Sequence, residues 1–467
     1  MDENRGRSGA PENRKSWFET RGSRILAHVP LSRLPHFIET TMTPETRQSE
    51  ELARAPLDDE TRARGRRLAI TSHASGMTYW TAYTDFLPTL LLEFIGASEF
   101  QIGLQSAFLP GLQLLQLPTL RRIAHIRKRT ILLFGQVVAL LGGLPLLFLD
   151  PLLSLGEATA RIVALLSFAL VAVGLNIGNT VWFPMLRSYI DSHRVGQFFG
   201  TIRSVWNFVL ILYFVGAQRW LSFYPGDFAS LFAVAWFLGL LRIALIARMP
   251  ERSERTDGKI RVREAFARVR EDPNLQRYLT GVTLAAAVRT STIPFAIVMM
   301  RREIGMPASD IIFTTLAYYF GALASLYAWG RVTDRIGSAP IFRMTSLGMA
   351  ALLLLLVTID VNNPQNFGVV LFFFFAYSLL TAGFGVADTQ VLFQLTPPDA
   401  PARTLVMCGV ITNGIRALAP IIVGVLLEFA LQMSEDRISV YHGLFAVMAL
   451  LQALSYIPLR GFTRKPA

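Results

Sequence analysis

The sequence predicts an all-α polytopic membrane protein, and three observations lead to this fold class. Of the 467 residues, 52% are hydrophobic and only 17% are charged, a balance that soluble domains rarely have. The chain contains many apolar stretches long enough to cross a bilayer core of about 30 Å. Runs such as 352–357 and 371–375 have no polar helical face, as expected of helices that contact lipid. A disordered, collagen-like or disulfide-built protein is excluded, since the only cysteine is Cys408.

Twelve apolar segments have the length of a transmembrane helix, and they divide into two sets of six. The longest connection, residues 249–276, separates a predicted bundle at 68–248 from a second bundle of nearly equal length at 277–460. Such duplication builds many transporter folds, with the solute site at the interface between the repeats. The sequence therefore predicts two pseudo-symmetric six-helix bundles. The predicted spans are residues 68–94, 102–120, 130–149, 161–186, 201–221, 228–248, 277–299, 309–330, 340–359, 367–396, 404–431 and 441–460.

Residues 1–67 differ from the rest of the chain. They carry 13 basic and 11 acidic residues, little periodicity and no apolar core of the kind that a signal peptide needs. We expect a disordered cytoplasmic N-terminal tail. Two alternatives stay open, namely a short helix lying on the membrane surface and a true start at Met42. Residues 461–467 are expected to form a short cytoplasmic C-terminal tail.

The formal net charge of +12 has two readings. A basic protein can bind nucleic acid, but the basic stretches of this chain have no folded soluble domain to present them. Most Lys and Arg of the membrane part lie in the loops after the even-numbered spans, in the central connection or in the C-terminal tail, and few lie in the opposite loops. The positive-inside rule therefore places both termini in the cytoplasm, with the chain in the plasma (inner) membrane and without a nucleic-acid partner.

A loop motif follows the eighth span. The segment Gly330-Arg-Val-Thr-Asp334-Arg335-Ile-Gly337 resembles the G-x-x-x-D-R-x-G loop motif of the major facilitator superfamily. The corresponding first-half loop, residues 119–129, keeps the basic end of this motif but lacks its Asp and glycines. The resemblance spans about residues 68–460. It implies the superfamily fold, a secondary transporter of bacterial type, and a central cavity lined by spans 1, 4, 7 and 10.

A second motif follows the fourth span and is similar to the R-G-x-F-F-G-x-R turn of many bacterial superfamily members. Its residues here are Arg194, Gly196, Gly200 and Arg203. Pseudo-symmetry would bring Asp334 to the start of span 5, where a carboxylate can bond exposed helix N–H groups. We expect the two motifs to form a cytoplasmic gate, unless Asp334 only bonds Arg331 or Arg335. Because the first-half loop lacks the Asp, we expect the resting balance to favour an inward-open state.

Five ionisable residues lie well inside the spans, where each costs roughly 2.5–3.5 kcal/mol at a helix centre. Arg242 lies close to a helix end, so we expect its side chain to snorkel to the interface. Asp388 and Arg416 lie at similar depths and form either a structural ion pair or part of a functional site. Asp85 on span 1 and Arg289 on span 7 occupy equivalent places in the duplication, which favours a functional role for both.

The candidates for substrate binding or coupling are polar residues of the spans that the resemblance places around the cavity, with Arg416 of span 11. The two arginines favour an anionic or polar solute, whereas an aromatic lining allows an amphipathic drug. The asparagines could instead bond neighbouring helices, for about 0.6 kcal/mol each. Asp85 is also a candidate for carrying a coupling proton. The full set is Asp85, Tyr83, Asn176, Asn179, Arg289, Asp388 and Arg416.

These features predict a secondary active transporter that moves a small organic solute by alternating access. The alternatives are a protein of the same fold that acts as a sensor or assembly factor, and a lipid flippase. The sequence predicts no cofactor, no metal site and no enzyme chemistry, because it has no phosphate-binding loop, no metal-ligand spacing among its histidines and no catalytic constellation. The expected partners are the small-molecule substrate, the lipid bilayer and a proton or other coupling ion, with the monomer as the functional unit.

Overall fold

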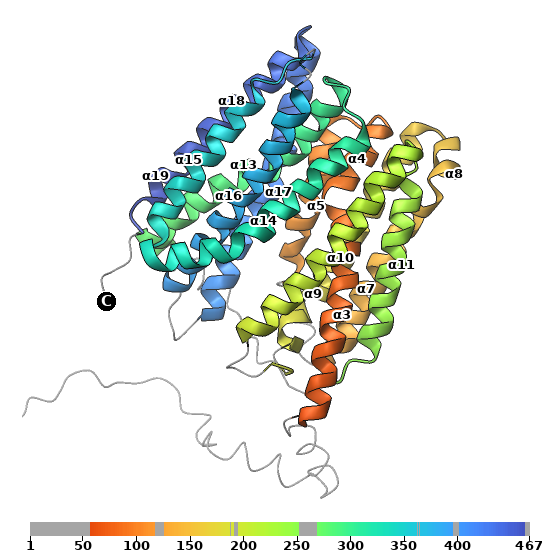
Figure 1. Cartoon of the computed structure of the whole chain (residues 1–467), viewed down its shortest axis with the longest axis vertical. Coiled ribbons are helices and arrows are strands. Elements are labelled where there is room, and N and C mark those ends of the chain that lie inside the picture. The colour runs from red at the N-terminus through yellow and green to blue at the C-terminus, as the bar shows by residue number, and fades with distance from the viewer. Residues whose placement is uncertain are drawn as a thin grey trace, which may run out of the picture. The chain divides into compact units, whose positions relative to one another are not determined.

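A computed structural model of the chain describes residues 57–116, 126–186, 188–190, 195–251, 269–361, 363, 365–395 and 401–462. Within these ranges the chain is helical, and no strand occurs. Figure 1 shows long helices with α3 to α11 gathered on one side and α13 to α19 on the other. Residues 56–467 belong to one unit of mutually contacting helices. The predicted all-α polytopic fold is therefore confirmed.

The described helices follow the predicted spans. In the first half they are α3 (Asp59–Thr84), α4 (Phe86–Phe94), α5 (Glu99–Leu112), η2 (Gln113–Leu115), α7 (Lys128–Gly143), η3 (Leu144–Phe148), α8 (Leu149–Ser154), α9 (Glu157–Leu186), α10 (Val195–Phe223) and α11 (Phe228–Ala247). In the second half they are α13 (Pro273–Arg302), α14 (Ala308–Ile336), α15 (Ser338–Leu356), α16 (Asn366–Leu395), α17 (Pro401–Met433), α18 (Arg437–Leu454) and α19 (Tyr456–Leu459).

Ten of the described helices are long and apolar enough to cross a membrane by length and composition. They correspond to predicted spans 3 to 12. Span 1 is formed by α3 and α4, where α3 contains buried polar residues such as Ser72, Ser75 and Thr78, and span 2 contains α5, which is 14 residues long. The first two spans are thus the most polar or the shortest of the set, and both contribute to the central cavity described below.

Two predicted boundaries are corrected by the helix ends. Residues 59–67 were expected to belong to the disordered tail, but α3 begins at Asp59 because the Asp58 carboxylate caps it, accepting from the Thr61 N–H at 3.1 Å. The Gly330–Gly337 segment was expected to be a loop, but α14 continues to Ile336. It ends there because Gly337 adopts φ of 82°, which glycine tolerates better than other residues.

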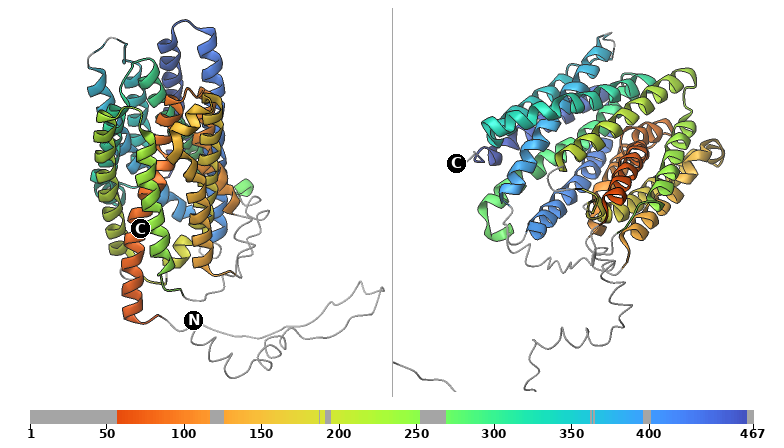
Figure 2. Two further views of the ribbon diagram at one scale, coloured as in Figure 1. Left: turned by 90° about the vertical axis from the view of Figure 1, so that its right-hand side faces the viewer. Right: turned by 60° about the horizontal axis from the view of Figure 1, so that its bottom comes forward.

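Two seams join the halves. In one, α5 packs along α17, and in the other, α10 packs along α14. Glycines allow the first seam to close tightly, since a Cβ on Gly103 would overlap the carbonyl oxygen of Pro420 and one on Gly424 would lie 2.6 Å from that of Glu99. The two views in Figure 2 show the long helices of both halves running side by side.

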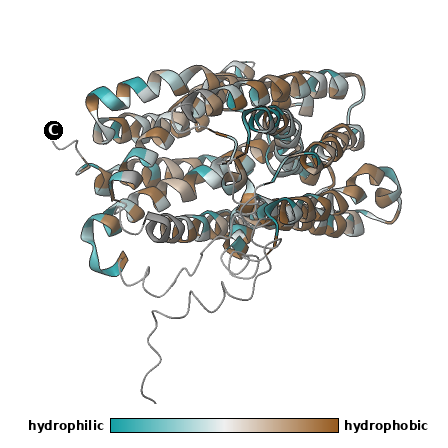
Figure 3. Ribbon diagram, turned by 90° about the horizontal axis from the view of Figure 1, so that it is seen from below, coloured by the Kyte–Doolittle hydropathy of each residue, from teal (hydrophilic) through white to brown (hydrophobic). Residues whose placement is uncertain are grey.

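The outer faces of the helices are apolar. Large side chains such as Phe134, Phe183, Phe237 and Phe429 are more than half exposed, at 58–62%. In a soluble protein such surfaces would aggregate, whereas a bilayer solvates them. Figure 3 shows the same pattern, with brown predominating along most helices and teal confined to short stretches. The polar groups that remain inside the bundle therefore stand out as candidates for function.

Candidate functional site

A cavity of about 460 Å³ lies between the halves. Its walls come from α3, α4 and α5 of the first half and from α13, α14, α16 and α17 of the second. Apolar residues such as Phe86 and Ile293 line part of it, and the rest of the lining is polar. The polar lining consists of Thr84, Asp85, Thr89, Ser106, Arg289, Thr290, Tyr318, Thr381, Asp388, Thr412 and Arg416.

Asp85 lies at a break between α3 and α4. Its backbone adopts φ −105° and ψ −115°, which is not helical. The break is favoured locally because Pro88, one turn later, cannot donate a backbone hydrogen bond to Thr84. The carboxylate accepts a hydrogen bond from the Tyr319 hydroxyl on α14 at 2.7 Å. Asp85 is exposed to the cavity and, through Tyr319, joins one half to the other.

Asp388 and Arg289 lie on the facing helices α16 and α13. The Tyr278 hydroxyl donates to Asp388 Oδ1 at 2.6 Å, which ties α13 to α16 within the second half. The Arg289 guanidinium lies over the Phe384 ring, 4.3 Å from its centre. Each of these two charged groups is therefore held by a neutral aromatic residue rather than by an opposite charge.

Arg416 reaches from α17 toward α13. Its Nε donates to the Thr290 hydroxyl at 3.4 Å, and its Nη1 donates to the Asn413 side-chain oxygen at 3.3 Å. Of the two alternatives for Asp388 and Arg416, the structural ion pair does not form, because each of these two described side chains bonds neutral groups on α13 or on its own helix. The side chain of Arg416 is exposed and lines the cavity.

The four charged residues of the cavity act on one another electrostatically without pairing. Arg416 attracts Asp85, Arg289 attracts Asp388, and the two arginines repel each other. None of these four described residues forms an ion pair with another. The site can offer its charges to a solute because it does not neutralise them internally.

Three other predicted site residues lie outside this cavity. The Tyr83 hydroxyl donates to the Phe232 carbonyl at 3.1 Å on α11, so it joins helices of one half. Asn176 donates to the Leu109 carbonyl at 3.1 Å and accepts from Gln116, which is the interhelical role weighed as its alternative. Asn179 is half-buried and does not line the cavity. Only Asp85, Arg289, Asp388 and Arg416 come together.

The sequence did not single out the residues that hold these charges. Tyr319 and Tyr278 orient the two carboxylates, and Thr290 receives Arg416. Tyr278 was detectable, since it lies about three helical turns before Arg289 on the same helix. Tyr319 was not, because it lies on span 8, which the resemblance did not place at the cavity.

The end of the bundle opposite to Asp59 and Leu459, called here the distal end, is held by ion pairs between the halves. Arg301 on α13 bonds Glu93 on α4 at 2.9 Å, and Arg302 bonds Glu99 on α5 at 2.6 Å. Glu428 on α17 also accepts from the Phe100 N–H at 3.1 Å. The Glu99 side chain is only 7% exposed, so its pair is shielded from water. The two halves are thus fastened together beyond the cavity.

The predicted cytoplasmic gate lies at the other end. Arg194 lies outside the described residues, whereas Gly196, Gly200 and Arg203 belong to the first turns of α10. Gly330, Asp334 and Arg335 belong to the last two turns of α14, and Gly337 follows them. Since α10 packs along α14, the two motifs lie on neighbouring helices. A contact between Asp334 and the start of α10 stays a prediction.

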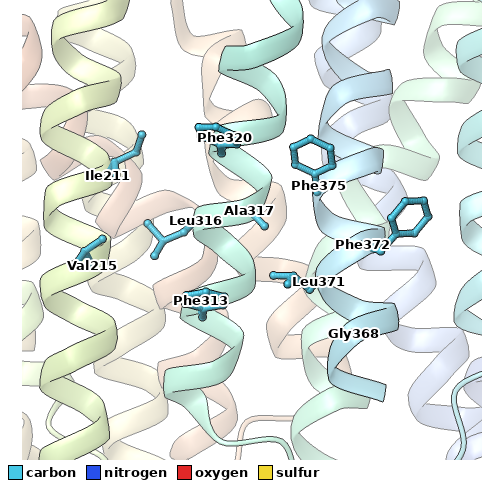
Figure 4. Close-up of a pocket in the computed structure, with 10 residues that line it drawn as sticks. All are labelled: Ile211, Val215, Phe313, Leu316, Ala317, Phe320, Gly368, Leu371, Phe372 and Phe375. Carbon is cyan, nitrogen blue, oxygen red and sulfur yellow. The ribbon is translucent and has the colours of Figure 1, made fainter. Parts of the chain in front are cut away.

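An apolar groove of about 550 Å³ lies on the second seam, between α10, α14 and α16. Figure 4 shows Ile211 and Val215 on α10 facing Leu316 and Phe313 on α14, with aromatic side chains of α16 beyond them. All ten lining residues are apolar, and none of them lines the charged cavity.

Comparisons with known proteins agree with this architecture. Residues 278–467, which include the Gly330–Gly337 motif, match the family model described as Major Facilitator Superfamily. The chain has the fold of this superfamily. The fold that the loop-motif resemblance implied is confirmed, and the chain is a multi-pass membrane protein. No curated relative matches the sequence.

Several solved transporter structures share the fold. The nucleoside transporter NupG superposes with a TM-score of 0.66 at 13% identity, over 87% of this chain and 100% of that one. A D-xylose-proton symporter gives 0.62 at 14% identity, over 87% and 98%. A POT family transporter in complex with 5-aminolevulinic acid gives 0.65 at 10% identity, over 86% and 96%. At such identities the likeness shows the fold and carries no information about the solute.

Proposed function

We propose that this protein is a secondary active transporter that moves a small organic solute across the plasma (inner) membrane by alternating access. The observation that carries the proposal is the charged cavity between the two halves, which is fastened at the distal end by the Arg301–Glu93 and Arg302–Glu99 ion pairs. A cavity bounded by two bundles, with separable contacts at one end, is the arrangement that alternating access requires.

The charge distribution of the loops supports an orientation with both termini in the cytoplasm. In that orientation the distal end faces the periplasm, and its ion pairs belong to an inward-facing state. This inward-facing state agrees with the inward-open preference that we expect because the first-half loop lacks the Asp of the motif. Export and import both pass through it, so the direction of transport is left to experiment.

The two guanidiniums of the cavity support a solute that carries an anionic group. Arg289 and Arg416 both line the cavity, and Arg416 donates to Thr290, so a carboxylate or phosphate there would gain charge-assisted hydrogen bonds. Asp85 and Asp388 line the same cavity and would accept from hydroxyl or ammonium groups of the same solute. The volume of about 460 Å³ lies within the range of small-molecule sites, which is about 300–1,000 Å³.

Coupling to a proton is proposed at Asp85. Its carboxylate accepts from Tyr319 of the other half and faces Arg416, so protonation would change both the contact between the halves and the charge beside the solute. Asp388 shares only the second feature, because its Tyr278 partner lies in its own half. The carboxylate that can link a proton to the relative position of the halves is therefore Asp85.

The proposal is tested with purified full-length protein in two steps. A thermal-shift screen first compares carboxylate-bearing solutes with their neutral amides, because a ligand that binds only the folded state raises Tm. Proteoliposomes then measure uptake of the ligand that raises Tm most. Transport of the carboxylate but not of the amide supports the proposal. If a ligand binds in the cavity but uptake never exceeds that of empty liposomes, the sensor alternative replaces it.

The lipid flippase alternative has one observation in its favour, namely the apolar groove between α10, α14 and α16. A flippase also needs a polar path for the headgroup that connects with the groove. The groove and the charged cavity share no lining residue, so the proposed transporter accounts for more of the site. A fluorescent-lipid scrambling assay on the same proteoliposomes separates the two functions.

A further inference from the structure

A second polar site lies inside the first half, away from the cavity. It consists of His73 on α3, Trp182 on α9, Trp206 on α10 and Arg242 on α11, and is called here the Arg242 cluster. The sequence predicted that Arg242 snorkels to the membrane surface, but this is wrong, because the residue is only 5% exposed. None of the four residues lines the charged cavity.

The cluster gathers polar atoms without partners. In the part of the chain that the structure describes, eleven buried side-chain nitrogens and oxygens have no hydrogen-bond partner. Four of them belong to this one site, namely Arg242 Nε, Arg242 Nη1, His73 Nδ1 and Trp206 Nε1. Three are obligate donors, and the imidazole nitrogen becomes one in the matching tautomer. Four hydrogen-bonding nitrogens of one cluster are therefore buried without an acceptor from the described protein.

Packing holds these donors in place. The His73 ring stacks on Trp182 with 5.4 Å between centres, and the Arg242 guanidinium lies 5.3 Å from the centre of the same Trp182 ring. Trp206 meets the His73 ring edge-on at 6.2 Å. Gly76 makes room for the arginine, since a Cβ there would overlap its guanidinium. The packed rings therefore restrain the side chains that carry these donors.

The charge of this site is not balanced by the protein. Arg242 forms no ion pair with any carboxylate among the described residues, and the other charged group that acts on His73 is Arg203, which is also basic. Contact with one indole face compensates only part of the cost of burying a guanidinium in a membrane-embedded bundle. A buried cation surrounded by further donors is the environment that stabilises an anion.

We propose that the Arg242 cluster binds a small anion inside the first half. The anion would carry one negative charge and would accept hydrogen bonds from the guanidinium, the indole N–H and the imidazole N–H. Chloride and a carboxylate group share this chemistry. The inference is independent of the proposed transport function, because it rests on residues that do not line the cavity.

The test uses tryptophan fluorescence, since two of the four residues are tryptophans. Purified full-length protein in sodium isethionate, whose bulky anion carries no carboxylate, receives bromide at constant ionic strength, and acetate is tested as a competitor. We expect a saturable quench on top of the linear collisional one, and a saturable rise in Tm of about 2–4 °C. Saturation by bromide identifies an inorganic anion, and saturation by acetate alone identifies a carboxylate. If neither anion saturates, the proposal is overturned.

Variants locate the anion. Arg242→Met should abolish the saturable quench and the rise in Tm, whereas Arg219→Met, at an arginine that stacks on Phe223 elsewhere on α10, should keep both. Loss of the response in Arg416→Met with its retention in Arg242→Met would place the anion in the cavity and refute the proposal. Should Arg242→Met not fold, Trp206→Phe removes one donor and should raise the half-saturating concentration about tenfold. An unchanged half-saturation in that variant would also refute it.

Discussion

The distal end and the cavity contain the same charged groups arranged in opposite ways. The two ion pairs of the distal end and the cavity each have two carboxylates and two guanidiniums, contributed by both halves. At the distal end Glu93 and Glu99 pair with Arg301 and Arg302 across the halves. In the cavity, Asp85, Asp388, Arg289 and Arg416 bond tyrosine, threonine, asparagine or an aromatic ring instead. Similar sets of charged side chains therefore form ion pairs that join the halves in one region and stay unpaired with each other in the other region.

This difference shows what decides the role of a buried charge. A pair that satisfies itself across two halves stabilises the state in which it forms, and breaking it leaves an uncompensated charge. A charge held by a neutral partner keeps most of its electrostatic attraction for an incoming solute. We therefore expect substitutions in the cavity to change binding, and substitutions at the distal end to change the population of states.

The largest expected effect is in the cavity. Arg416→Gln removes the guanidinium beside Thr290 and should weaken binding of an anionic solute about 10–100-fold, as loss of a charged hydrogen bond of about 1.5–3 kcal/mol predicts. The measurement is solute affinity by isothermal titration, together with Tm of the unliganded protein. Because Arg416 has no ion-pair partner among the described residues, the Tm of the unliganded variant should stay within about 2 °C of the wild-type value. Normal affinity in the variant would move the anion site elsewhere.

The next effect is at the distal end. Glu99→Gln leaves Arg302 partly buried without its charge partner and should raise the distal-open population about tenfold, which corresponds to about 1.4 kcal/mol. The readout is the labelling rate of Thr89→Cys in a Cys408→Ser background by an impermeant maleimide added from the distal side. Glu303→Gln is the matched control, because Glu303 pairs with Arg437 inside one half. Equal acceleration by both variants would contradict a gate between the halves.

A smaller effect separates the two cavity carboxylates. Tyr319→Phe removes a hydrogen bond that crosses the halves, whereas Tyr278→Phe removes the same type of bond within one half. We expect Tyr319→Phe alone to raise the distal labelling rate, about fivefold for a bond of about 1 kcal/mol. Matching rates in the two variants would show that Asp85 does not take part in holding the halves together.

Much of the fold could be predicted from the sequence, because apolar length and loop charge are local properties. The helices occur at the predicted spans, and the loop motif around Asp334 indicated the superfamily whose fold the chain has. Details that depend on helix capping were predicted wrongly. The sequence predicted that the first span begins at residue 68, whereas α3 begins at Asp59. The sequence also treated Gly330–Asp334 as loop, since a motif does not reveal how far a helix continues.

The site was predicted less completely, because pairing across helices is not a local property. The sequence indicated the four cavity charges and left open an ion pair between Asp388 and Arg416 on the basis of depth, whereas Tyr278 and Thr290 receive them. It placed Arg242 at the membrane surface from its distance to the helix end. The gap that Gly76 leaves for the guanidinium, which allows Arg242 to turn inward, lies on another helix.

The smallest expected effect tests which polar groups are structural. Asn176 bonds the Leu109 carbonyl on α5, whereas Asn179, three residues later, is half-buried and has no such bond in the described structure. Asn176→Ala should lower Tm by about 1–3 °C, because an interhelical hydrogen bond in a membrane contributes about 0.6 kcal/mol and the truncation also leaves a small void. Asn179→Ala should change Tm less, and neither variant should alter solute affinity, since both residues lie outside the cavity. Differential scanning fluorimetry and titration on the same samples check both statements. A loss of affinity in Asn179→Ala would mean that α9 reaches the solute in another conformation of the protein, and Asn179 would then count among the functional polar groups.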